Sequence, residues 1–111
     1  MTHQSFIIAL DAPILNKNGL DVVTVYNEDD VRLNCQAHGD PPPEFNWYQD
    51  GEGVNDVWPM TISDTMVQSM YPYKTTLVIT QAIPSDSGTY RCEARNSIGG
   101  SSRNFQVDVR G

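Results

Sequence analysis

The most regular feature of the chain is an alternation of apolar and polar residues with a period of two. Each alternating segment places apolar side chains on one face and polar side chains on the other. The segments are residues 31–37, 44–50, 74–80, 88–95 and 104–110. This period is typical of half-buried strands in antiparallel sheets, and helical periodicity is nearly absent. The pattern predicts an all-β fold.

Residues that favour turns separate these segments. Asn-Gly, Pro-rich and Gly-rich runs occupy residues 18–19, 38–43, 50–53 and 97–101, and residues 84–88 favour a short helical turn or a corner. Strands interrupted at such spacing predict a sandwich or a barrel. The region 54–72 is weakly patterned, and we expect two short strands there, at 61–64 and 66–70. Residues 1–12 are either a linker or the first part of the first strand, with one domain over residues 13–111.

The composition of the chain limits the classes of partner that we expect it to bind. The chain has 111 residues, enough for one domain. Seven basic residues against 14 acidic residues give a net charge of −7. This charge would repel a nucleic acid backbone or an anionic membrane surface, so neither is an expected partner. No apolar run is long enough to span a bilayer, so we expect no membrane insertion by this domain.

The run Ser85-Asp86-Ser87 suggests a nucleophile at first sight. A catalytic serine needs a base beside it, usually a histidine that a third group orients. The only histidines are His3, in the N-terminal segment, and His38, in the proline-rich turn. We therefore interpret the run as turn chemistry, and we expect no enzyme activity, no metal site and no cofactor.

Two cysteines, Cys35 and Cys92, lie too far apart for a CxxC redox or zinc motif. They are consistent with one disulfide, which would indicate an oxidising compartment, although two free thiols are the alternative.

The residues around these cysteines resemble the immunoglobulin superfamily, and its I-set group most of all. The resemblance covers roughly residues 13–110. Its motifs are L-x-C, G-x-P-P-P, W-Y-x-D-G and a long L-x-I…D-x-G-x-Y-x-C-x-A-x-N-x-x-G. They include Leu33, Cys35, Trp47, Leu77, Asp86, Gly88, Tyr90 and Cys92.

The resemblance implies a two-sheet, antiparallel, Greek-key β-sandwich, with sheets A-B-E-D and A′-G-F-C-C′. It implies that Cys35 and Cys92 bridge the sheets, that Trp47 packs on the bridge, and that Tyr90 forms a tyrosine corner above Gly88. Relatives often pair the aspartate of this motif with a basic residue at the start of strand D, and that residue is missing here. Asp86 then either caps the turn or pairs with Lys74.

Two groups of residues are candidates for contact with a partner. Trp58, Met60 and Tyr71 place large side chains in the weakly patterned region, where they either cover the core or form an interface. Arg91 and Arg95 are expected to point outward on one strand, with Arg103 and Arg110 on the next. These arginines either pair with neighbouring acidic residues or form a basic edge that meets an acidic partner.

The resemblance implies a non-catalytic recognition or spacer module. The expected parent is a multidomain adhesion molecule, receptor ectodomain or matrix protein at the cell surface or outside the cell. The alternative is a structural domain of a giant muscle protein in the cytoplasm. The expected partners are proteins, homophilic or heterophilic, and the neighbouring domains of the parent chain.

Overall fold

A computed structural model describes residues 10–111, which contain nine strands and one turn of 3-10 helix at Pro84–Asp86. The strands are β1 (Asp11–Leu15), β2 (Leu20–Tyr26), β3 (Val31–Asp40), β4 (Glu44–Gln49), β5 (Glu52–Gly53), β6 (Met60–Met66), β7 (Tyr73–Ile79), β8 (Gly88–Arg95) and β9 (Gly100–Arg110). Strand β1 begins at Asp11, and residues 1–9 lie outside the described part of the chain.

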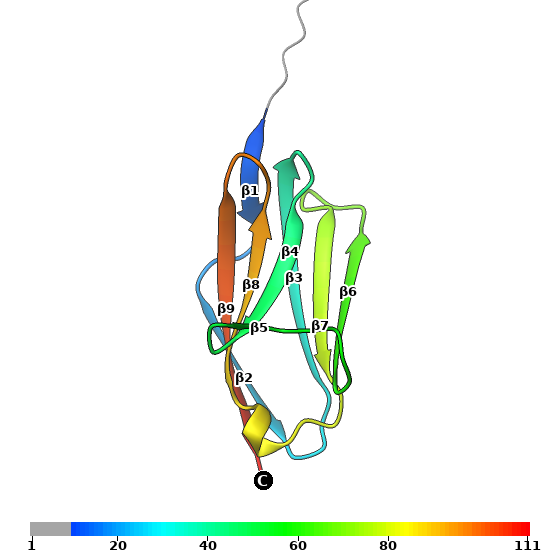
Figure 1. Cartoon of the computed structure of the whole chain (residues 1–111), viewed down its shortest axis with the longest axis vertical. Coiled ribbons are helices and arrows are strands. Elements are labelled where there is room, and N and C mark those ends of the chain that lie inside the picture. Colours follow the sequence, from blue (N-terminus) through cyan, green and yellow to red (C-terminus); the bar gives the residue numbers. More distant parts are fainter. Residues whose placement is uncertain (1–9) are drawn as a thin grey trace, which may run out of the picture.

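The strands form two facing sheets (Figure 1). One sheet has the order β1-β3-β7-β6 and the other β2-β9-β8-β4-β5. These orders are A-B-E-D and A′-G-F-C-C′, so the predicted sandwich is confirmed. One pairing differs from a purely antiparallel arrangement, because β2 runs parallel to β9. The chain crosses from the first sheet to the second between β1 and β2, and this crossing sets the direction of β2.

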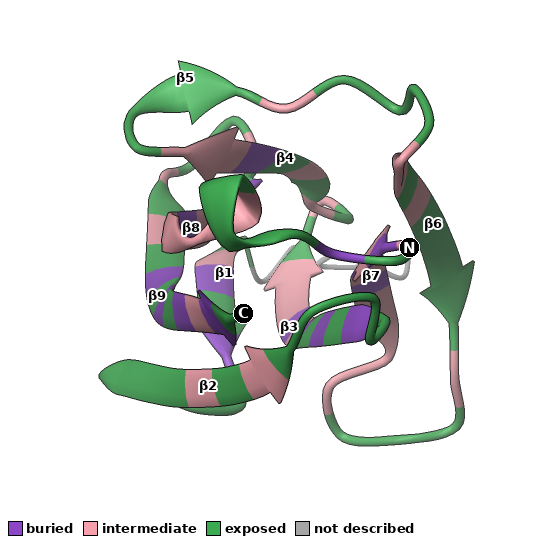
Figure 2. Cartoon of the chain, turned by 90° about the horizontal axis from the view of Figure 1, so that it is seen from below, coloured by how far each residue is buried: buried purple, intermediate pink, exposed green. Residues whose placement is uncertain are grey.

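The core lies between the sheets, where Figure 2 shows buried segments alternating with more exposed ones along β3 and β9, and with intermediate ones along β8. The alternation predicted for residues 31–37 is confirmed: every second residue from Val31 to Ala37 is buried. Leu33 on β3 and Leu77 on β7 face each other in register and are both buried. Burial of aliphatic and aromatic side chains is the main force that holds the sheets together.

The weakly patterned region folds differently from the prediction. One strand, β6, spans Met60–Met66 and pairs along its whole length with β7, in place of two short strands. Residues 67–72 form the turn that follows, closed by a hydrogen bond from Val67 N to Pro72 O (2.8 Å). The alternation is weak because β6 is an edge strand with only Met60 and Ile62 packed against the core.

Candidate recognition surface

A rigid frame lies at the centre of the sandwich. Cys35 on β3 and Cys92 on β8 form a disulfide that joins the two sheets, with the α-carbons 6.7 Å apart. Trp47 on β4 is paired in register with Cys92 and is buried. Its indole N–H donates to Oγ1 of Thr75, a fully buried threonine on β7, at 2.9 Å. This hydrogen bond satisfies two polar groups that would otherwise be buried without partners.

Hydrogen bonds of Asp86 hold the turn before β8. The hydroxyl of Tyr90 donates to the backbone carbonyl of Asp86 at 2.6 Å, which is the tyrosine corner. The carboxylate of Asp86 accepts the backbone N–H of Ile83 at 2.9 Å, so Asp86 caps the turn. Burial, with the nearby charges of Asp86 and Asp50, raises the pKa of Tyr90 far above its usual range.

The residues proposed for the contact patch do not form one patch. Trp58 lies in the loop between β5 and β6, next to Val57, and is 71% exposed. Met60 begins β6 and packs partly against the core. Tyr71 lies beyond the opposite end of β6, where its ring contacts the ring of His38 at 5.2 Å between centroids. Trp58 and Tyr71 are therefore separated by the length of β6.

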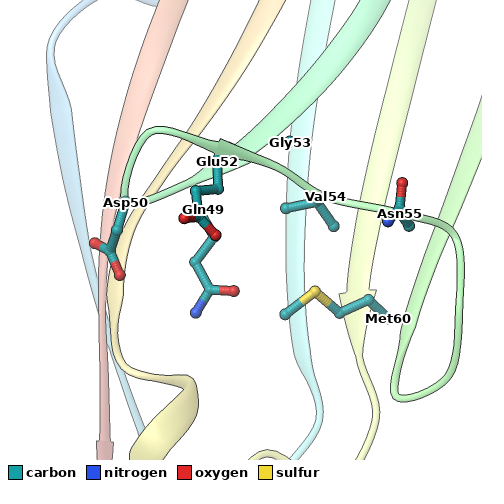
Figure 3. A pocket seen from close by; sticks show the side chains of 7 residues that line it. All are labelled: Gln49, Asp50, Glu52, Gly53, Val54, Asn55 and Met60. Atoms are coloured by element: carbon teal, nitrogen blue, oxygen red, sulfur yellow. The ribbon is translucent and has the colours of Figure 1, made fainter.

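The loop that carries Trp58 also borders a hollow of about 490 Å³ (Figure 3). Its lining residues are Gln49, Asp50, Glu52, Gly53, Val54, Asn55 and Met60. Asp50 is already engaged, because its Oδ1 accepts the backbone N–H of Thr89 at 3.0 Å. Within residues 10–111 no group of three His, Cys, Asp or Glu side chains is placed to hold a metal ion.

Arg91 and Arg95, the two arginines predicted to point outward, each contact a neighbouring side chain. Arg91 stacks on the ring of Tyr48, with the guanidinium carbon 4.6 Å from the ring centroid. Arg95 lies 3.4 Å from Glu93 on its own strand. Both arginines are on the outer face of the five-stranded sheet, as predicted, and these partly exposed contacts are individually weak.

Arg103 follows the first of the two alternatives, because it pairs with an acidic residue and does not belong to an exposed basic edge. It occupies an inward position on β9, in the same alternation as Phe105, and is only 6% exposed. Its guanidinium pairs with Asp21 of β2, donates to the carbonyl of Asn34 on β3 at 3.2 Å, and lies over the Phe105 ring. Arg103 therefore bridges the sheets at the crossing between β1 and β2. Its alternation with Phe105 is the signal in the sequence that could have identified it as inward.

Sequence reasoning missed a second exposed apolar group, on β2. Leu20, Val22 and Tyr26 all point outward and are 59%, 69% and 62% exposed. Val23 and Val25 of the same strand pack against the core. The signal was present in the segment LDVVTVY, because apolar residues occupy both faces of a strand that has only one buried face.

Two facing sheets, a disulfide between them, a buried tryptophan beside it and a tyrosine corner define an immunoglobulin-like sandwich. The profile of the immunoglobulin I-set domain matches residues 17–109, and the chain belongs to this family. The immunoglobulin domain itself is non-catalytic.

The relatives include a cell adhesion molecule and a muscle M-line assembly protein. The chain is 35% identical to mouse Hemicentin-2 over 79 residues, which is 71% of this chain and 1% of that protein. It is 38% identical over 68 residues to the Drosophila cell adhesion molecule Dscam1, which is 61% of this chain and 3% of that protein. It is 35% identical over 83 residues to mouse Myopalladin, which is 73% of this chain and 6% of that protein. The chain thus spans only a small part of these relatives.

Solved structures show the same fold. Titin domain M7 superposes with a TM-score of 0.80 at 22% identity, covering 94% of this chain and 99% of that one. The titin domains Z1Z2 in complex with telethonin superpose with a TM-score of 0.78 at 29% identity, covering 93% of this chain and 49% of that one.

Proposed function

We propose that residues 11–111 form a protein-recognition module within a multidomain adhesion molecule, receptor ectodomain or matrix protein. The observation that carries this proposal is the disulfide between Cys35 and Cys92. Disulfides persist in oxidising environments and are rare in the cytosol, which favours an extracellular location. The likeness to hemicentins and to Dscam1 supports the same reading.

Within this proposal, the loop around Trp58 is the first candidate contact surface. An exposed tryptophan beside an exposed valine offers a large apolar area, and tryptophan is enriched among the residues that dominate binding energy. The sandwich supplies a rigid support, because β6 pairs with β7 along its whole length immediately after the loop. Recognition would then depend on shape complementarity and on the burial of apolar surface, and no bond would be made or broken.

A structural role inside muscle cells is the second candidate. The observation that favours it is the likeness to Myopalladin, to the muscle M-line assembly protein unc-89 and to several titin domains. Two solved structures of such domains are complexes, one with telethonin and one with an obscurin-like 1 Ig domain. By analogy, a protein partner is expected under this role as well.

Mass spectrometry of protein isolated from its native compartment separates the two roles. One sample would be treated with an alkylating reagent during lysis without reductant. A second sample would be treated with a reductant first and alkylated afterwards. The extracellular role predicts that Cys35 and Cys92 are alkylated only after reduction. Alkylation of both cysteines without reduction would contradict the extracellular role and favour the muscle role.

A further inference from the structure

The two sheets have four edge strands, β1 and β6 in one sheet and β2 and β5 in the other. Edge strands present unpaired backbone groups to other chains unless something obstructs them. Strand β1 contains Pro13 and a register irregularity, and β5 has only two residues. On β6, Met60 N donates to Val57 O at 2.9 Å, and Ile62 N donates to Asp56 Oδ1 at 3.1 Å. Each of these three edges is thus short, irregular or partly covered.

Strand β2 differs from these three edges. The turn at its end shows which of its backbone N–H and carbonyl groups point toward the free edge. Asn27 N donates to Arg110 O of β9 at 2.7 Å. In a parallel pair only alternate residues bond the neighbouring strand, so the odd-numbered residues of β2 face β9 and the even-numbered residues face the free edge. Tyr26 agrees with this, because its N–H and carbonyl bond Asp29 in the turn and not β9.

Three residues of β2 therefore remain open at the edge. The N–H and carbonyl groups of Leu20, Val22 and Thr24 have no hydrogen-bond partner within residues 10–111. The strand contains neither lysine, arginine nor proline, the residues that commonly protect an edge. Its single charged side chain, Asp21, is paired with Arg103.

The outer face of β2 is apolar, whereas the outer face of the neighbouring strand β9 is polar. The outward residues of β9 are Ser102, Asn104, Gln106, Asp108 and Arg110. On β2 the outward row contains Leu20, Val22 and Tyr26, all more than half exposed. An open edge with an apolar row beside it can gain both backbone hydrogen bonds and apolar burial from an added strand.

We propose that this edge pairs with the β2 edge of a second copy of the chain, joining two five-stranded sheets across a two-fold axis. A register centred on Val22 fits the open groups. It places Leu20 opposite Thr24 and Val22 opposite its own counterpart, so every open N–H meets an open carbonyl. Asp21 falls opposite Val23, which avoids like charges across the axis. The proposal rests on the recognition function above and names a partner for it.

Self-association of the 111-residue chain tests the proposal. Sedimentation velocity over a concentration series reaching about 1 mM should show a reversible monomer–dimer equilibrium. Val22→Lys places two like charges at the two-fold axis and should weaken dimerisation about tenfold or more. Thr61→Lys makes the same change of charge at an exposed position on β6 and should leave the dimer intact. Higher salt should strengthen the wild-type dimer, because each copy carries a net charge of −7.

A covalent readout covers the case in which Val22→Lys fails to fold. Opposed residues in a hydrogen-bonded antiparallel pair have α-carbons about 5.5 Å apart, within the range of a disulfide. Val22→Cys should therefore cross-link into a dimer on mild oxidation far faster than Thr61→Cys. The proposal is overturned by a chain that stays monomeric throughout the series, by a dimer insensitive to Val22→Lys, or by equal cross-linking of the two cysteine variants. None of these results would affect recognition through the loop around Trp58, which is measured separately.

Discussion

The carboxylate of Asp50 lies against the α-carbon of Gly88. Asp50 follows β4, where its Oδ1 accepts the N–H of Thr89 at 3.0 Å and its own N–H donates to the Thr89 carbonyl at 2.8 Å. A β-carbon on Gly88 would lie 2.6 Å from Oδ2 of Asp50. The aspartate of the W-Y-x-D-G motif and the glycine of the D-x-G-x-Y motif therefore act on one another across two neighbouring strands.

Gly88→Ala should destabilise the domain by about 1–3 kcal/mol, because the new methyl group meets the carboxylate and the backbone has a φ of +155°. Urea unfolding measures this loss. Gly53→Ala is the matched control, since a β-carbon there has no neighbour within 4 Å. Adding Asp50→Ala should recover part of the loss; strictly additive effects would show that the two residues do not interact.

Tyr90→Phe should lower the free energy of unfolding by about 1–3 kcal/mol near neutral pH, because it leaves the Asp86 carbonyl without its donor. Chemical denaturation of the two proteins in parallel gives the difference. A loss no larger than that of Tyr26→Phe, on an exposed tyrosine, would contradict a structural role for the corner.

The same tyrosine makes stability depend on alkaline pH. The folded state raises the pKa of Tyr90, so above the ordinary tyrosine pKa of about 10 the unfolded chain loses this proton while the folded chain keeps it. The contribution of Tyr90 is fully present below pH 10 and falls by about 1.4 kcal/mol for each pH unit above it. Tyr90→Phe should unfold with a shallower dependence on pH between about pH 10 and 11; equal slopes would contradict this.

Trp58→Ala should weaken capture of a protein partner from an extract of the native compartment and should change stability by less than about 0.5 kcal/mol, since Trp58 is exposed. Affinity capture and thermal unfolding are the two measurements. Met60→Ala is the contrasting variant and should lower the melting temperature, because Met60 packs partly against the core. A large loss of stability in Trp58→Ala would make Trp58 a core residue.

Asp21→Ala should destabilise the domain by about 1–3 kcal/mol, because it leaves the buried guanidinium of Arg103 without its carboxylate. Asp21 is itself 48% exposed in its side chain, so solvent screening keeps the loss below that of a fully buried pair. Combining Asp21→Ala with Arg103→Met should restore part of the stability in denaturant unfolding. A double variant less stable than Asp21→Ala would show that Arg103 contributes mainly through Asn34 and Phe105.

Much of the fold could be predicted because alternation and spacing are local properties of the sequence. Cys35 and Trp47 lie on strands with one buried face, and that face determines their positions. Edge strands such as β6 are less constrained, which is why its bounds were predicted poorly. Whether Trp58 and Tyr71 lie together depends on the length of β6 and on its pairing with β7. The residue types at these two positions do not predict that pairing.

The disulfide also determines how the domain would respond to tension. The described chain enters at one end of the sandwich and leaves at the other (Figure 1), so tension in a longer chain would act along the strands. The bond between Cys35 and Cys92 would pass this force directly from β3 to β8. The segment between the two cysteines would bear no load, and of the described chain only the 25 residues before Cys35 and the 19 after Cys92 could extend as the domain unfolds. Reduction of this single bond would more than double the length that the chain releases.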